Sequence, residues 1–355
     1  MKINIVFPYN TWGGAFRSTY ELANRMKESG EDVEIYFPFF PYLEDESLFS
    51  WQGIKLILRG IIRSIIRRNR IPWFNVDVKI RLVPLIKNRY IRDADAIIAN
   101  HWPTAFSVHQ LSKSKGSKFY CIRDTEPWSK AYNKELEAFS LPLKKIVTLT
   151  WIKEFLEKEV NQIVVGIVPN GINPRDFEVK NKKYNNPPTI SMIYSTHPAK
   201  GIPDGLEVLN QIKIQFPKVK ILLFGFTKPP KLKFESEFCH RPVKEELKEI
   251  YAKSDIFLCP SLQEGYHNPP REAMLAECAV VATNVGSIPE CTIPGETALV
   301  VEPGDTKGMI ESIADLINNP IKIEEMGKSS KKHIMQFTWE NSTNILIDIL
   351  NKHTK

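Results

Sequence analysis

Short apolar runs alternate with amphipathic stretches along most of the chain. Residues 3–7 form an apolar run, a turn-rich loop follows over residues 8–14, and residues 17–29 have helical periodicity. Gly30 ends that helix, and residues 33–37 are predicted as a second strand. This β–loop–α–β order predicts the opening of a doubly wound parallel sheet, and so an α/β protein.

The same pattern continues and then restarts after a polar stretch at residues 179–188, which we interpret as a linker. Further strands are predicted before it at residues 96–99, 118–122, 145–149 and 163–168, and after it at residues 189–194, 219–226, 256–259, 280–284 and 298–301. Helices are predicted at residues 203–215, 243–253 and 268–277 and in three segments at the end of the chain. We therefore expect two Rossmann-like domains, residues 1–180 and 181–337, with a ligand cleft between them.

Composition excludes several protein classes. The 355 residues are 43% hydrophobic and 25% charged, the balance of a globular protein rather than a disordered chain. We find no apolar run long enough for a transmembrane helix and no signal peptide, which favours a cytoplasmic location. The five cysteines form no CxxC pair, and no HExxH, GxSxG or GxGxxG motif occurs.

Positive charge is concentrated in one window. Residues 53–92 contain eleven basic residues and one acid, a sum of +10 against +7 for the whole chain. Within it, residues 53–74 have the pattern of a basic amphipathic helix with aromatic residues at its ends, which suits an anionic membrane surface. A core-facing helix with a solvated basic face gives the same pattern. We expect no nucleic-acid partner, because no base-reading module accompanies the charge.

Residues 260–277, PSLQEGYHNPPREAMLAE, hold the densest group of candidate functional residues. Glu264 lies in the loop after a predicted strand, and Glu272 follows eight residues later on a helix that Pro269 and Pro270 can begin. The free N–H groups of such a helix start bind phosphate, and carboxylates accept hydrogen bonds from hydroxyls. Phosphates and hydroxyls together describe a nucleotide sugar, although an isolated pair of glutamates would be read as ordinary surface acids.

This segment resembles the signature of the retaining glycosyltransferases of family 4, the group 1 glycosyl transferases, which have the GT-B fold. The matching residues are Pro260-Ser261, Glu264-Gly265-Tyr266 and Glu272-Ala273-Met274. Four further segments resemble the family: AVVATNVGSIPE, GETALVVEPGD, VPNGIN and FTWE. The details are most similar to a bacterial subgroup that builds polysaccharides and includes rhamnosyl and mannosyl transferases.

The resemblance implies two Rossmann-like domains that face each other across a cleft, with the last helix, residues 338–355, packed back on the first domain. It implies a hexosyltransferase that moves a sugar from a nucleotide-diphosphate donor to a glycan or lipid-linked acceptor, without cofactor or metal. The location would be cytoplasmic, peripheral on the inner face of the membrane. Two alternatives remain: a sugar-nucleotide epimerase or phosphorylase on the same fold, and a catalytically silent glycan-binding scaffold at the membrane.

The resemblance also implies roles for individual residues. Glu264 would face the donor sugar, Glu272 would hold the ribose, and Lys200 would neutralise the diphosphate. Backbone groups of Gly13 and Gly14 would let substrates approach closely. Donor contacts are also expected from the donor loop and from a position near the base: Gly265, Tyr266, His267, Asn268 and Arg241.

Three features depart from the family pattern. The donor loop reads Tyr266-His267-Asn268 instead of the commoner glycine-containing form, which leaves the identity of the donor sugar open. Ser195 stands where the family usually has an arginine, so His197 or Arg17 could supply the missing cation. Arg123 and Asp124 stand where many members have a histidine beside the donor sugar, which makes Asp124 a catalytic candidate. Arg17, Arg123 and His101, which follows a predicted strand, are the candidates for acceptor contacts.

Overall fold

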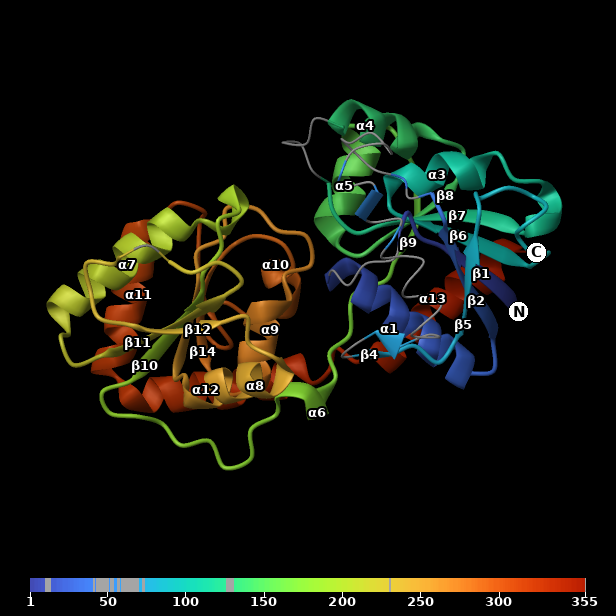
Figure 1. The fold of residues 1–355 in the computed structure, drawn as a ribbon. Helices are drawn as coiled ribbons and strands as arrows, with labels where there is room; N and C mark the ends of the chain where they lie inside the picture. The colour runs from blue at the N-terminus through green and yellow to red at the C-terminus, as the bar shows by residue number, and fades with distance from the viewer. Residues whose placement is uncertain are drawn as a thin grey trace. The chain divides into compact units, whose positions relative to one another are not determined.

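A computed structural model of the chain describes residues 1–9, 14–40, 42, 51, 54, 55, 58, 70, 71, 74–125, 131–229 and 231–354. Its internal contacts divide the chain into two compact units (Figure 1). The first unit contains residues 1–171 and 339–355, and the second contains residues 172–338. The predicted α/β class is confirmed, because each unit is built on a parallel sheet with helices.

The first unit has a seven-stranded sheet among its described residues, ordered β5-β2-β1-β6-β7-β8-β9, and all of its strand pairs are parallel. The strands are β1 (Lys2–Val6), β2 (Asp32–Pro38), β5 (Lys79–Val83), β6 (Ala96–Asn100), β7 (Ser117–Ile122), β8 (Lys144–Val147) and β9 (Val164–Ile167), with a small antiparallel pair, β3 (Arg70–Ile71) and β4 (Phe74–Asn75). The helices are α1 (Gly14–Glu28), α3 (Trp102–His109), α4 (Tyr132–Ser140), α5 (Thr150–Lys158) and α13 (Trp339–Thr354).

One face of this sheet packs against α1 and α13. Alternate residues of β1 and β2 point to that face, where Ile3, Ile5 and Ile35 share a core with Leu346 and Leu350 of α13. Side chains alternate between the two faces of a strand, so this register leaves the residues between them on the opposite face. The final helix therefore completes the core of the first unit.

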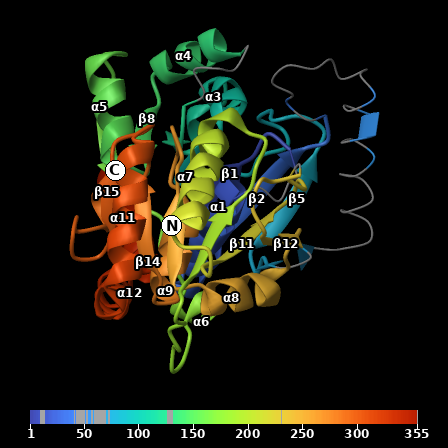
Figure 2. The ribbon, with the colours of Figure 1, turned by 90° about the vertical axis from the view of Figure 1, so that its left-hand side faces the viewer.

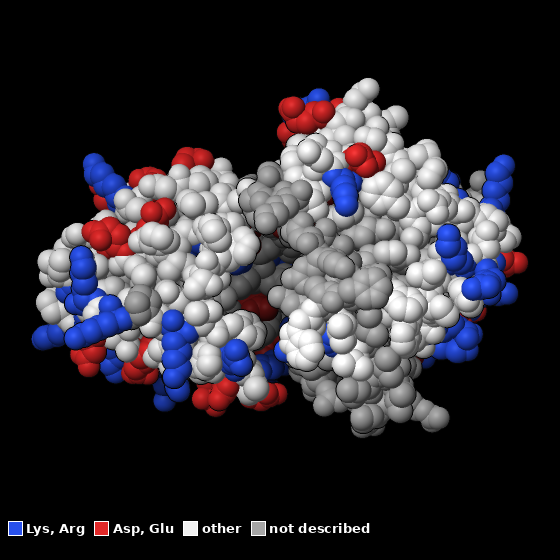
Figure 3. Space-filling model, turned by 45° about the horizontal axis from the view of Figure 1, so that its top comes forward, with Lys and Arg blue, Asp and Glu red and all other residues white. Residues whose placement is uncertain are grey.

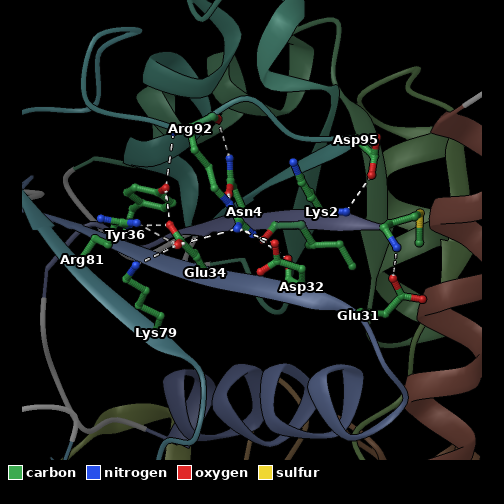
Figure 4. A network of polar contacts seen from close by, with 12 residues as sticks. Lys2, Asn4, Glu31, Asp32, Glu34, Tyr36, Lys79, Arg81, Arg92 and Asp95 are labelled. Atoms are coloured by element: carbon green, nitrogen blue, oxygen red, sulfur yellow. Dashed lines mark hydrogen bonds and ion pairs between the residues drawn. The ribbon is translucent and has the colours of Figure 1, made fainter.

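Polar residues occupy the opposite face of β1, β2 and β5 (Figure 4). Glu34 accepts hydrogen bonds from Nε and Nη2 of Arg81 at 2.5 and 3.0 Å and from the Tyr36 hydroxyl at 2.7 Å. Arg92 donates to Oδ1 of Asn4 at 3.0 Å, and Asn4 donates back to the Arg92 carbonyl at 3.0 Å. Glu34 and Asn4 are buried, and this network gives both of them hydrogen-bond partners.

The second unit has a six-stranded parallel sheet among its described residues, ordered β12-β11-β10-β13-β14-β15. The strands are β10 (Thr189–Ile193), β11 (Lys220–Gly225), β12 (Glu237–His240), β13 (Ile256–Cys259), β14 (Ala279–Thr283) and β15 (Leu299–Val301). The helices are α6 (Pro174–Phe177), α7 (Ile202–Gln215), α8 (Lys244–Lys253), α9 (Asn268–Leu275), α10 (Ile288–Cys291), α11 (Thr306–Asn318) and α12 (Pro320–Ile334). Helices α7 and α11 share one core on this sheet, and α8 and α9 share the other (Figure 2).

Each sheet has one point at which the strand order reverses. In the first unit this point lies between β1 and β6, and in the second it lies between β10 and β13. Ligands of open α/β sheets bind outside the carboxyl ends of the strands at such a point. The loops after β6 and β13 are therefore the places to look for functional side chains.

Most of the predicted elements agree with the structure to within a few residues at each end, but the sequence analysis did not predict β5, α3, α4 or α5. The units separate at residues 171 and 172, before the polar stretch that we had interpreted as the linker. Most of the basic segment at residues 53–74 lies outside the described residues, and Figure 3 draws the residues that are not described in grey. Among the helices that are described, none combines the length and apolar character needed to span a membrane.

Candidate active site

A buried carboxylate lies at the carboxyl end of β13 in the second unit. The Glu264 side chain is 9% exposed, and Nζ of Lys200 contacts both of its oxygens, at 2.7 and 2.9 Å. The Ser261 hydroxyl donates to Oε1 at 2.7 Å, and Nε2 of His267 lies 3.3 Å from the same oxygen. Glu264 and Lys200, both predicted as catalytic residues, are therefore in direct contact in the structure.

Two turns hold this cluster together. Gly201 has φ 58°, and a Cβ there would lie 1.8 Å from the carbonyl oxygen of Pro260, so a side chain is excluded. The N–H of Leu262 donates to the carbonyl of Ala199 at 2.7 Å. The turn that carries Lys200 is thus joined directly to the loop that carries Glu264.

Burial and neighbouring charges shift the pKa values of Glu264 and His267 in this cluster. Burial acts to raise the pKa of Glu264, but His267, Lys200 and Ser261 more than offset it and lower the pKa. Burial lowers the pKa of His267 to about 4, so this ring is neutral near pH 7. Lys200 therefore supplies the positive charge beside an ionised Glu264.

Glu272, predicted to hold the ribose, lies on α9. The Tyr251 hydroxyl, from α8, donates to Oε2 of Glu272 at 3.1 Å. Burial and then Glu272 raise the pKa of Tyr251 well above its usual range, so the phenol stays protonated and acts as a donor. Pro269 and Pro270 lie in the first turn of α9, as predicted.

The other donor-side candidates are distributed around the same edge of the sheet. Ser195 follows β10, and its hydroxyl accepts from the N–H of His197 at 3.1 Å. Gly265 and Tyr266 are buried, and the guanidinium of Arg271 lies over the Tyr266 ring at 4.7 Å. Two further candidates lie at element ends: Asn268 begins α9, and the exposed Arg241 follows β12 with φ 55°.

A cavity of about 150 Å³ opens in the first unit beside the carboxyl ends of β6 and β7. Its lining residues are Phe16, Asn100, His101, Trp102, Tyr120, Cys121, Ile122, Arg123, Asp124 and Glu135. The cavity brings together three candidates from two segments that are separate in the sequence, His101 from one and Arg123 and Asp124 from the other.

Arg123 links three strand ends around this cavity. Its Nη1 donates to Oδ1 of Asn170 at 2.9 Å, and its Nε donates to Oδ1 of Asn100 at 3.4 Å. Asn100 also accepts from the Thr19 hydroxyl at 2.9 Å. The guanidinium is therefore engaged with side-chain amides, which makes Arg123 a structural as well as a candidate functional residue.

The remaining candidates of the first unit are placed as follows. Oδ1 of Asp124 accepts from the N–H of Thr125 at 2.8 Å. His101 precedes α3 with φ 97°, and burial lowers its pKa to about 4. Gly14 begins α1 and Arg17 is half-buried on it, whereas Gly13 lies outside the described residues.

Several residues around the two sites were given no role in the sequence analysis. Ser261 and Gly286 lie in segments that resemble the family, but nothing in the pattern indicated their contacts with Glu264. Tyr251 and Asn170 act through elements distant in the sequence, so only the fold brings them to the site. In the part of the chain that the structure describes, no group of three or more His, Cys, Asp or Glu side chains is arranged to hold a metal ion.

Comparison with known sequences identifies a family match and several relatives of this chain. Residues 187–319 match the family Glycosyl transferases group 1. The capsular polysaccharide biosynthesis glycosyltransferase CapM of Staphylococcus aureus is 27% identical over 255 residues, 65% of this chain and 66% of that protein. The MMP alpha-(1->4)-mannosyltransferase of Mycolicibacterium hassiacum is 26% identical over 187 residues, 49% of this chain and 45% of that protein. The aligned stretches thus span less than two thirds of these relatives.

Comparison with solved structures extends over nearly the whole chain. A sucrose-phosphate synthase from Thermosynechococcus elongatus has a TM-score of 0.73 at 15% identity, covering 99% of this chain and 98% of that one. Anabaena HepE, solved in complex with UDP-glucose, has a TM-score of 0.72 at 14% identity, covering 99% and 100%. At these identities the likeness shows the fold alone. The chain therefore has the GT-B fold, and its residues 187–319 form a glycosyl transferases group 1 domain.

Proposed function

We propose that this protein is a retaining glycosyltransferase of family 4 that transfers a hexose from a nucleotide-diphosphate sugar to a glycan or lipid-linked acceptor. The observation that carries the proposal is the contact of Lys200 with both oxygens of Glu264. This pair lies at the carboxyl ends of the strands, beside the point where the strand order of the group 1 domain reverses. The cluster therefore contains both a carboxylate that can accept hydrogen bonds from sugar hydroxyls and a cation that can neutralise a diphosphate.

In the proposed reaction the acceptor oxygen forms a bond to the anomeric carbon on the face from which the diphosphate departs. The bond from that carbon to the diphosphate oxygen breaks, and the acceptor proton passes to the departing diphosphate. Negative charge grows on the diphosphate, so fixed positive charge and N–H donors stabilise the transition state most. Lys200 and the backbone N–H groups at the start of α9 would supply them, with no metal required.

Two further roles are proposed for groups near the carboxyl ends of the strands. Glu272, oriented by Tyr251, would accept hydrogen bonds from the ribose hydroxyls. In the first unit, the cavity that holds Asp124 and His101 would accept part of the acceptor. Aromatic rings beside polar groups suit a sugar ring, because they offer both an apolar face and hydrogen bonds.

The relatives support a biosynthetic role. The CapM relative is named for capsular polysaccharide biosynthesis, and HepE was solved with UDP-glucose. We therefore propose polysaccharide assembly in the cytoplasm, at the inner face of the membrane, with a donor related to those of the rhamnosyl and mannosyl transferases. Attachment through the basic segment at residues 53–74 is part of this proposal, and flotation with anionic against neutral vesicles tests it. Equal absence from both vesicle fractions would contradict it.

The experiment that tests the donor site is a thermal-shift panel of UDP, GDP, dTDP and ADP with their sugars, each with and without a chelator. Ligand binding raises the melting temperature by mass action, so one nucleotide series is expected to give a shift that chelation does not remove. Glu272→Ala should abolish that shift. Glu296→Ala, an exposed glutamate of the same unit, is the matched control and should leave it unchanged.

The two rival functions give different outcomes. A shift with release of free nucleotide and no transfer to any acceptor would indicate an epimerase or hydrolase on this fold. Absence of any shift, with Glu264→Ala leaving cellular function unchanged, would indicate a glycan-binding scaffold instead.

A further inference from the structure

His267 has a backbone conformation that few side chains adopt. Its φ is 57° and its ψ is 77°, in the left-handed region where glycine is the usual residue. A non-glycine residue persists there only when the surrounding structure over-determines it, and such residues cluster at functional sites. The chain therefore keeps an imidazole at a position where glycine would be easier to accommodate.

The surroundings fix both the backbone and the ring. Gly286, with φ 60°, lies so close that a Cβ there would be 2.6 Å from the carbonyl oxygen of Gly265 and 3.3 Å from Cβ of His267. The ring has no exposed surface, and Sγ of Cys259 lies 3.2 Å from Nε2 and 3.7 Å from Nδ1. The imidazole is therefore held in one place by the strand end on one side and the Gly286 turn on the other.

The ring meets the carboxylate at one oxygen. Nε2 lies 3.3 Å from Oε1 of Glu264, slightly beyond an ordinary hydrogen bond, while Ser261 donates to the same oxygen. Oε1 of an ionised carboxylate only accepts, so the neutral ring must carry its proton on Nε2 to interact favourably there. Sγ of Cys259 lies nearer to Nε2, at 3.2 Å, than to Nδ1, at 3.7 Å, and burial raises the pKa of this thiol to about 12, so it stays protonated beside the ring.

We propose that His267 is a positioning residue for the proposed glycosyl transfer: its imidazole, backed by Cys259, fixes the Glu264 carboxylate in the orientation in which Lys200 bridges both oxygens. The inference rests on the proposed function and adds to it, because the loop around the glutamate differs here from the usual glycine-containing form. A loosened carboxylate would still lie in the site but would meet the donor sugar in the wrong orientation. Misplacement of this kind lowers turnover more than it lowers binding.

The test compares His267→Gln with His267→Leu. Both keep a side chain of similar length in the left-handed conformation, but only glutamine keeps an N–H donor within reach of Oε1. We expect kcat of His267→Leu to fall roughly ten- to a hundredfold, and that of His267→Gln to stay within about threefold of wild type. Nucleotide Kd, measured by calorimetry, should change by less than about twofold in both, because Glu272 and the α9 N–H groups are untouched.

Two further variants complete the design. His267→Gly removes the donor and also relaxes the backbone, so it is expected to fold even if His267→Leu does not. Its kcat should fall by the same factor as that expected for His267→Leu. Asn181→Gly, at an exposed residue of the same unit with φ 56°, is the control for relaxing a left-handed position and should keep wild-type kcat.

The outcomes separate the two proposals. Equal kcat in the glutamine and leucine variants, or wild-type kcat in the glycine variant, would overturn the role of His267. A loss of nucleotide affinity in parallel with kcat would indicate a merely structural role and would also overturn it. Failure of the wild-type protein to bind any nucleotide sugar would instead overturn the proposed function.

Discussion

Each unit buries a glutamate against basic side chains, but the two glutamates occupy different parts of their sheets. Glu34 lies within β2, and Arg81, from the neighbouring strand β5, approaches it across the sheet face. Glu264 lies in a loop beyond the end of β13, and Lys200 approaches it from another loop. Regular strands thus supply one pair, and the loops at the reversal of strand order supply the other.

The pKa is lowered for both glutamates, including the one that we regard as structural. Arg81, Tyr36 and Arg92 together overcome the effect of burial and lower the pKa of Glu34 to about 2. Burial and Glu34 raise the pKa of Tyr36 to about 12. The comparison teaches that a perturbed carboxyl group marks a charged network, and that its place on the sheet decides whether the network serves stability or chemistry.

The sharpest test of this difference is Glu264→Gln. It keeps the size of the side chain but removes the charge that Lys200 and the sugar hydroxyls would meet. We expect transfer to fall roughly a thousandfold, the loss typical of removing one electrostatic contact from an active site. Turnover with a radiolabelled donor measures it, and a melting temperature close to that of wild type shows that the fold is kept. Wild-type turnover would place Glu264 with Glu34 among structural residues.

The matched change in the first unit is Glu34→Gln. It leaves Arg81 without a carboxylate, whereas Arg92 keeps Asp32 at 2.7 Å. Removing one partner of a buried ion pair costs about 3 kcal/mol. We expect that loss in the free energy of unfolding from urea titration, with kcat unchanged in the folded enzyme. If kcat per folded molecule also fell, Glu34 would contribute to the reaction, and the distinction between the two glutamates would be wrong.

Acid should destabilise the protein in two separate windows. The pKa of His267 is about 4 when folded against 6.5 when unfolded, so the unfolded chain takes up the proton first as the pH falls from 6.5 to 4. The pKa of Glu34 is about 2 when folded against 4.5 when unfolded, so its contribution is lost between pH 4.5 and 2. We expect a loss of about 3 kcal/mol in the lower window and a loss at least as large in the upper one, from urea titrations at successive pH values.

Variants show which residue is responsible for the loss of stability in each pH window. Glu34→Gln should flatten the lower window only. His267→Gln should flatten the upper window in part, because His101 also has a pKa of about 4 and loses stability over the same range. If Glu34→Gln flattened the upper window instead, the assignment would be wrong.

The smallest expected effect comes from Ser261→Ala. It removes one of the donors to Oε1 of Glu264 while Lys200 and His267 remain. We expect kcat to fall by at most about tenfold, the equivalent of one ordinary hydrogen bond. A fall as large as that of Glu264→Gln would mean that the hydroxyl itself takes part in the reaction.

Much of the fold followed from the sequence because parallel strands buried on both faces are continuous apolar runs. Strand β5 was not predicted because Arg81, which lies on the polar face of the sheet, interrupts its sequence KIRLV. Its partner Glu34 interrupts the apolar sequence of β2 in the same way. The boundary between the units was placed at a polar stretch, whereas the contacts place it between residues 171 and 172, before that stretch begins. Polarity along the chain therefore located loops better than it located domain limits.

The candidate site was predictable only in part. Glu264, Lys200 and Glu272 were found through resemblance to a family, and the structure brings the first two into contact. The contact of His267 with Cys259 could not be predicted, because it depends on a left-handed backbone that the sequence does not reveal. The partners Tyr251 and Gly286 come from other elements, and one sequence gives no sign that they meet this loop.

The path of the chain through the units has a consequence for biosynthesis on the ribosome. The first unit is discontinuous: its core takes Trp339, Leu346 and Leu350 from the last helix, whereas the second unit is one continuous stretch. A Cβ on Gly171 would lie 2.2 Å from the backbone nitrogen of Trp339, so the two crossings of the chain are packed side by side. During translation the second unit emerges whole while the first still lacks one wall of its core, and the N-terminal sheet reaches its final packing last.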